Sequence, residues 1–148
     1  MSLNPLSEVR YRYRLASEHL SRAERMFEAG DWVGTVLSSQ LAVENFAKAV
    51  VAAFEVPTWS HDPSGQLEGV ASRAPPHLAS RMAELARMAR ELAPEHGRAT
   101  YGEPSRGLTP GDIYKRKHAE EALEMARRAK GLAEEILAEL GVSLERAQ

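Results

Sequence analysis

Residues 32–54 constrain the fold most strongly, because apolar side chains surround nearly the whole circumference of the helix that they predict. Glu55-Val56-Pro57 ends this helix, since proline cannot continue it. A helix that is apolar on every side must be covered by more than one neighbour. The segment is therefore either the central helix of a bundle or half of a dimer interface. Its large apolar residues are Trp32, Val33, Val36, Leu37, Leu41, Val43, Phe46, Val50, Val51 and Phe54.

One face of this helix also carries two charged residues. Leu37, Leu41, Glu44 and Lys48 follow one another at steps of three and four, so they share that face. Glu44 precedes Lys48 by four residues, the order that favours an ion pair within a helix. The simplest interpretation is an exposed strip with one salt bridge of little energetic value, but polar residues on a strongly apolar helix need a further explanation.

Amphipathic periodicity predicts three more long helices, over residues 6–29, 76–92 and 111–140. Gly30 can end the first of them in the left-handed conformation, and Asp31 can cap the helix that follows. The first two helices should therefore form a tight antiparallel hairpin.

The remaining segments are shorter. Ser64 can cap a short helix through residue 70, whereas residues 94–107 are predicted to be the longest irregular segment, a length usually associated with function or disorder. Thr109-Pro110-Gly111-Asp112 has the cap, proline and acidic residue of a helix start. With no strand pattern and no internal repeat, the sequence predicts an all-α fold: an antiparallel up-and-down bundle of four long helices plus one short helix.

The order of several short patterns resembles HEPN domains, which are nucleotide-binding domains of higher eukaryotes and prokaryotes. The residues that carry the resemblance are, in chain order, Ala29-Gly30, Gln40, Glu44, Lys48-Ala49 and His61-Asp62. It extends over about residues 7–140 and is closest to the small stand-alone prokaryotic branch. It implies a single HEPN-like domain over residues 1–148.

The resemblance also implies a function and partners. Members of this branch engage nucleotides or RNA, form homodimers, and act with a separately encoded minimal nucleotidyltransferase in toxin–antitoxin-like systems. Three functions of different classes therefore stay open for this chain: a nucleotide- or RNA-binding module, a metal-independent endoribonuclease with a composite dimer site, and a non-catalytic structural partner of the nucleotidyltransferase.

The ribonuclease members of the family have an arginine and a histidine separated by four to six intervening residues. The arginine would hold a phosphate, and the histidine would act as an acid or base. This spacing occurs in three pairs here, and roughly 1.5 pairs are expected by chance. The pairs are Arg12 with His19, Arg14 with His19, and Arg90 with His96.

Position in the chain favours Arg90 and His96 as the candidate catalytic pair, because they lie at the junction of the 76–92 helix and the irregular segment that follows it. His19 lies in the first helix and is interpreted as a surface or interface residue. Two features depart from the family pattern. Pro94 separates the pair, and Tyr101 follows His96 by five residues rather than two. If Tyr101 instead matches the family tyrosine, the segment resembles the branch that lacks the catalytic pair.

A second candidate site is a group of basic residues with aromatic side chains among them. Such a group can hold phosphates and stack bases. The glutamates that follow it can pair with its cations four residues away, so a solvated charged face is the alternative. The residues predicted to contact a ligand are Arg98, Tyr101, Arg116 and His118.

His61 and Asp62 complete the family pattern after the second helix. We interpret them as residues that fix the loop, with Asp62 in a turn and His61 bonding a helix terminus. A polar site at the end of the bundle is the alternative.

Composition argues against several other functions. With no cysteine there is no disulfide or thiolate chemistry, and a net charge of −2 argues against binding polyanions through bulk charge. The N-terminus has no secretory signal pattern, and no apolar run reaches membrane-spanning length, so we expect a cytoplasmic protein. No His, Asp and Glu set has metal spacing, and there is neither a phosphate-binding glycine loop nor a nucleophile elbow. The sequence predicts no metal and no cofactor.

Overall fold

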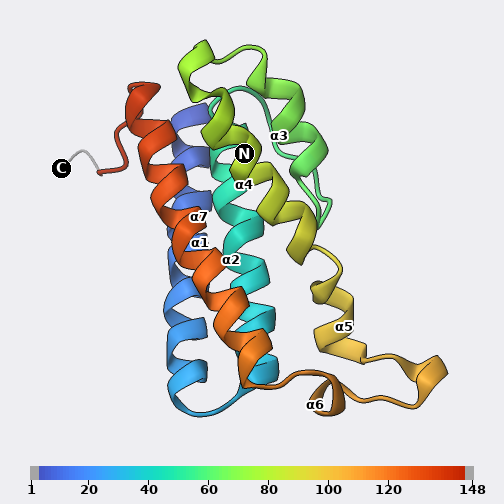
Figure 1. The fold of residues 1–148 in the computed structure, drawn as a ribbon. Coiled ribbons are helices and arrows are strands. Elements are labelled where there is room, and N and C mark those ends of the chain that lie inside the picture. The colour runs from blue at the N-terminus through green and yellow to red at the C-terminus, as the bar shows by residue number, and fades with distance from the viewer. Residues whose placement is uncertain (1–3, 146–148) are drawn as a thin grey trace.

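The computed structural model describes residues 4–145, and within that range it is built from helices without a β-strand (Figure 1). No helix in this range is both long and apolar enough to cross a membrane. The elements are, in chain order, α1 (Pro5–Glu28), α2 (Trp32–Ala52), α3 (Ser64–Ala71), η1 (Pro76–Leu78), α4 (Ala79–Leu92), α5 (Glu95–Tyr101), η2 (Pro104–Arg106), α6 (Pro110–Ile113) and α7 (Arg116–Glu139).

The four long helices α1, α2, α4 and α7 run alternately down and up, which confirms the predicted antiparallel bundle (Figure 1). Helix α2 is at its centre and packs against α1, α7, α4 and α5. The short helix α3 packs on α4. At the opposite end of α4, the segment from α5 to α6 leads into the start of α7 (Figure 1).

A single chain covers most of the apolar circumference of α2, through α1, α4, α5 and α7. The aromatic ring of Phe46 is fully buried, and so are Val43, Val50 and Val51. The central-helix interpretation is therefore confirmed. The dimer-interface alternative stays open, because five of the large apolar residues keep part of their surface exposed: Trp32, Val33, Leu37, Leu41 and Phe54.

The predicted hairpin between α1 and α2 forms with its predicted caps, Gly30 and Asp31, and with a further cap at Asn4. Asn4 Oδ1 accepts a hydrogen bond from the Ser7 amide at 2.8 Å at the start of α1. Gly30 follows α1 with a φ of 78°, and Asp31 Oδ1 accepts from the Gly34 amide at 2.8 Å. These caps satisfy amides that the first turn of each helix leaves without an intrahelical partner.

Residues 94–107 differ from their prediction, because most of them are regular. Pro94 immediately precedes α5, and Ala99 is buried against the core. Gly102 then ends the helix with a φ of 72°, and a Cβ atom there would lie 2.3 Å from the Leu108 carbonyl oxygen. Only glycine fits this conformation without strain.

The start of the last helix also differs from its prediction. Thr109 and Asp112 form the predicted capping box, with Asp112 Oδ2 accepting from the Thr109 amide at 2.9 Å, but this box begins only the single turn of α6. Tyr114 then takes an extended conformation, which buries its ring and brings its hydroxyl to Glu95. Burial of this aromatic side chain, a tertiary contact, thus divides the predicted helix in two.

Candidate functional site

A cluster of polar residues is buried in the middle of α2. Glu44 and Lys48 are only 6% and 3% exposed. Glu44 Oε2 accepts a hydrogen bond from Lys48 Nζ at 3.1 Å, and Glu44 Oε1 accepts one from Gln40 Nε2 at 3.0 Å. The ion pair predicted from the spacing therefore forms, but it is buried rather than part of an exposed strip. Removing a charged group from water costs roughly several kcal/mol per ion. The hydrogen bonds that Lys48 and Gln40 donate to Glu44 offset part of this cost.

Two histidines from distant parts of the chain complete this cluster. His61, in the loop between α2 and α3, places Nδ1 3.0 Å from Glu44 Oε1. His96, in α5, places Nδ1 3.0 Å from Gln40 Oε1. The two imidazole rings stack with their centroids 3.7 Å apart and an angle of 19° between them. We call Gln40, Glu44, Lys48, His61 and His96 the polar cluster.

The environment of the polar cluster favours a neutral His96. Burial lowers the pKa of His96 below its ordinary value, the charge of His61 lowers it further, and Glu44 opposes both effects. A neutral imidazole can accept a proton or bind a metal ion. Glu44, His61 and His96 are also the residues here that could hold a metal, because each offers a ligand atom within 4.8 Å of the others.

Of the two predictions for the residues after α2, the one for Asp62 is confirmed and the one for His61 is wrong. Asp62 Oδ1 accepts a hydrogen bond from the Ser64 amide at 3.0 Å, which confirms its predicted role in the turn before α3. The prediction for His61 is wrong, since His61 bonds a carboxylate in the middle of α2 instead of a helix terminus.

The structure does not bring Arg90 and His96 together. Arg90 is exposed on α4 and forms an ion pair with Glu68 of α3. His96 lies beyond the turn at Pro94 and bonds Gln40. Within residues 4–145, no hydrogen bond or ion pair joins Arg90 to His96.

Arg98 and Tyr101, two of the four predicted ligand contacts, lie on α5. Two carboxylates already hold Arg98: its Nη1 lies 3.2 Å from Glu95 Oε1 and its Nε lies 2.8 Å from Glu103 Oε1. The hydrogen bond to Glu103 raises the pKa of Arg98 above its ordinary value. Tyr101, at the end of the helix, leaves 75% of its surface exposed.

The other two predicted contacts lie at the start of α7. Arg116 Nε donates to Glu120 Oε1 at 2.9 Å, and its guanidinium carbon lies 5.3 Å from the centre of the Phe27 ring. His118 Nδ1 accepts from the Lys115 amide at 2.9 Å. A cavity of about 190 Å³ is lined by Arg98 and His118 but not by Tyr101 or Arg116, so the four residues gather only in part.

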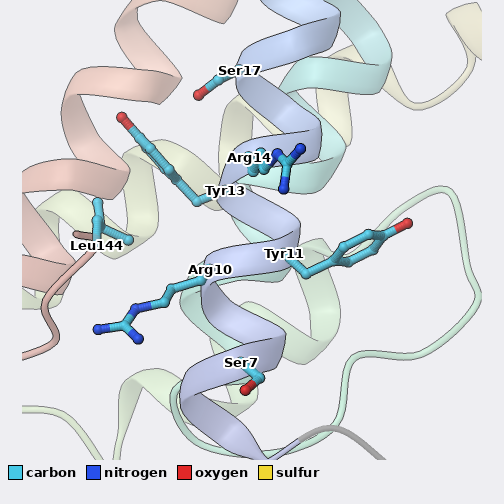
Figure 2. A pocket seen from close by; sticks show the side chains of 7 residues that line it. All are labelled: Ser7, Arg10, Tyr11, Tyr13, Arg14, Ser17 and Leu144. Atoms are coloured by element: carbon cyan, nitrogen blue, oxygen red, sulfur yellow. The ribbon is translucent and has the colours of Figure 1, made fainter. Parts of the chain in front are cut away.

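Sequence reasoning did not single out the outer surface of α1 as a site. A cavity of about 510 Å³ lies there, between α1 and the segment after α7 (Figure 2). In Figure 2, Arg10 points to the left of α1 and Tyr11 to the right, while Tyr13 reaches toward α7, where its hydroxyl bonds Glu134. Two smaller cavities of about 360 and 280 Å³ share Arg14 with it. We call Arg10, Tyr11, Arg14, Arg22 and Arg25 the α1 face.

In the described part of the chain, the cations of the α1 face have few acidic partners. Arg10 Nε donates to the Ser143 carbonyl oxygen at 3.0 Å, and Arg22 Nη1 lies 3.0 Å from His19 Nδ1. Arg14 Nε lies 3.6 Å from Glu18 Oε2, and both side chains are largely exposed. His19, predicted to be a surface or interface residue, is half-buried, and this burial lowers its pKa. The sequence signal for this face was that these arginines lie off the apolar stripe of α1.

The sequence model of the HEPN domain matches residues 9–137. The structure is similar to the crystal structure of TT1696 from Thermus thermophilus, with a TM-score of 0.70 and 22% sequence identity. That similarity covers 91% of this chain and 100% of the other, and at this identity it shows the fold alone. No curated protein matches the sequence.

Proposed function

Because the chain belongs to the HEPN domain family, we propose that it is a nucleotide- or RNA-binding protein whose α1 face holds the phosphate groups. The observation that supports this proposal is a series of three cavities along one helix that share Arg14 and are lined by four arginines beside an exposed tyrosine. Among residues 4–145, Glu18 is the one carboxylate that lines these three cavities.

The dimensions and chemistry of the α1 face suit a nucleic acid strand. Arg10 and Arg25 lie fifteen positions apart, which corresponds to roughly 22 Å along the helix axis. Guanidinium groups bind phosphate in planar, bidentate geometry. Tyr11 leaves 52% of its surface exposed, and an exposed aromatic ring can stack on a base. Several consecutive phosphates can therefore contact this one helix.

The group predicted from the sequence is a weaker candidate for the same role. Carboxylates hold Arg98 and Arg116, so a phosphate would have to displace Glu103 or Glu120. The ligand contacts of Arg98, Tyr101, Arg116 and His118 stay a prediction, secondary to the α1 face.

Binding is favoured over cleavage. The arginine and histidine of the predicted catalytic pair have separate partners, Glu68 for Arg90 and Gln40 for His96. The metal-independent ribonuclease function stays an alternative, and the separation of Arg90 from His96 argues against it.

Removal of two guanidinium groups from the α1 face tests the binding proposal. We expect the Arg10→Ala/Arg14→Ala protein to bind a fluorescently labelled single-stranded RNA at least about tenfold more weakly than the unmodified protein, because each charge-assisted hydrogen bond contributes about 1.5–3 kcal/mol. The slope of log K against log salt should fall by about 1.4, the value for two lost phosphate contacts on a single strand. Fluorescence anisotropy in EDTA at several salt concentrations measures both quantities.

A second double variant provides the matched control. Arg81→Ala/Arg87→Ala removes the same charge from α4, where carboxylates pair with both arginines. We expect this variant to keep the affinity of the unmodified protein. Equal losses in the two double variants, or the absence of salt-dependent RNA binding by the unmodified protein, would contradict the proposal.

We also propose a homodimer that acts with a minimal nucleotidyltransferase, on the strength of the family resemblance. Exposed apolar side chains in the loop after α2 support an interface, because Val56 and Trp59 are 82% and 95% exposed. Light scattering at several protein concentrations should give twice the chain mass of 16.3 kDa. A mass of one chain at every concentration would contradict the dimer.

A further inference from the structure

Three side chains with metal-binding atoms converge in the polar cluster. Glu44 belongs to α2, His61 to the loop after it, and His96 to α5, and their ligand atoms all lie within 4.8 Å of one another. We propose that Glu44, His61 and His96 bind a single transition-metal ion of the zinc class. This proposal goes beyond RNA binding by the α1 face and does not depend on it.

The distances are those of a site that closes on its ion. Zinc ligands lie about 2.0–2.2 Å from the metal, so ligand atoms in a tetrahedral site lie roughly 3.4 Å from one another. Glu44 Oε1 and His61 Nδ1 are already 3.0 Å apart. All the ligand atoms lie within 4.8 Å of one another, so no pair of them has to close by more than roughly 1.4 Å. The ring of His61 can make this movement, because it lies on a loop and its side chain is 55% exposed.

Metal binding requires the stacked imidazole rings to splay apart. In the structure they are nearly parallel, whereas the two rings must point at a common ion when both coordinate it. The hydrogen bonds of the two rings to Glu44 and Gln40 are the ones that a metal ion would replace. Each coordinating nitrogen then lacks a proton, and the ring proton is carried by the other nitrogen.

The residues around the three ligands are suited to support them. Lys48 bonds Oε2 of Glu44 at 3.1 Å, which leaves Oε1 available as a single-oxygen ligand. Gln40 Nε2 donates to Oε1 itself at 3.0 Å and orients the carboxylate, so Oε1 would bind the ion through its other lone pair, in place of its contact with His61. Hydrogen bonds of this kind fix the orientation of metal ligands and raise metal affinity.

The donor set and the nearby ammonium group select the class of ion. Two imidazoles with one carboxylate match zinc, cobalt and nickel, whereas magnesium and calcium prefer oxygen ligands alone. Lys48 opposes any additional cation, so an ion without strong affinity for imidazole should not bind. We therefore expect zinc and cobalt to bind, and magnesium not to.

The test is calorimetric titration of the tag-free, metal-free protein with Zn²⁺, together with the visible absorption spectrum of the Co²⁺ form. We expect one ion per chain and an affinity at least about tenfold lower in His61→Ala and in His96→Ala. His77→Ala is the matched control, because His77 is 57% exposed and also bonds a glutamate, Glu139, but lies outside the polar cluster. Its titration should equal that of the unmodified protein.

Three results would overturn the proposal: no saturable Zn²⁺ binding, unchanged binding by both His61→Ala and His96→Ala, or an equal loss in His77→Ala. Circular dichroism of each variant verifies that the helices remain. His61 lies on an exposed loop, so its replacement should leave the fold intact. The RNA measurements are made in EDTA on another surface, and their failure would leave this result unaffected.

Discussion

Glu44→Gln should lower the free energy of unfolding by about 3–5 kcal/mol, a large effect for a substitution that preserves shape. The variant removes the negative charge that faces Lys48, whose side chain is 4% exposed. The ammonium group then remains buried without a counter-charge. Urea denaturation followed by far-UV circular dichroism, in EDTA, measures the loss.

Two further variants separate loss of the charge pair from loss of packing. Lys48→Met should destabilise the protein by a similar amount, and the combined Glu44→Gln/Lys48→Met protein should recover most of the loss, because neither charge is then left alone. Glu91→Gln is the matched control: Glu91 also pairs with a cation four residues away, Arg87, but it is largely exposed. Its effect should stay within about 0.5 kcal/mol. A Glu44→Gln effect no larger than this would show that the buried pair contributes little.

Phe46→Ala should cost about 3–5 kcal/mol through the cavity that it leaves in the core. Phe46 is 0% exposed, and its ring packs against that of Tyr13, with the centroids 5.8 Å apart. The rigid helices around α2 can close such a cavity only in part. The midpoint of urea unfolding measures the effect.

Trp59→Ala is the contrasting aromatic truncation. Trp59 is 95% exposed in the loop after α2, so its loss should change the unfolding free energy by less than about 0.5 kcal/mol. Similar losses in the two variants would mean that the core does not have the packing described here.

Local sequence signals predicted most of the bundle. The periodicity of α1, α2, α4 and α7 and the caps at Gly30 and Asp31 depend on residues within a few positions of one another. The predicted helix over residues 111–140 failed because a tertiary contact outweighed the local pattern. Tyr114 interrupts a strong helical pattern because its ring is buried and its hydroxyl reaches Glu95, a partner nineteen residues away.

In the candidate sites, too, contacts between residues near in sequence could be predicted, whereas contacts between distant residues could not. The pair of Glu44 and Lys48 is four residues apart and could be predicted, but its burial depends on the helices that surround it. His61 and His96 meet only because α5 and the loop after α2 fold against the same part of α2. Spacing along the chain therefore linked His96 to Arg90, whereas folding links it to Gln40 and His61.

The two sides of α1 have a consequence for how the protein can diverge. Val9, Ala16, Leu20 and Ala23 are buried in the core, while the arginines and Tyr11 of the opposite side line open cavities. Substitutions on that outer side leave the core contacts in place. They should therefore change the free energy of unfolding little, which matters because this free energy is small in natural proteins. Over evolutionary time, the charge and shape of the outer side can change while the bundle persists. The same helical frame can thus come to recognise different ligands.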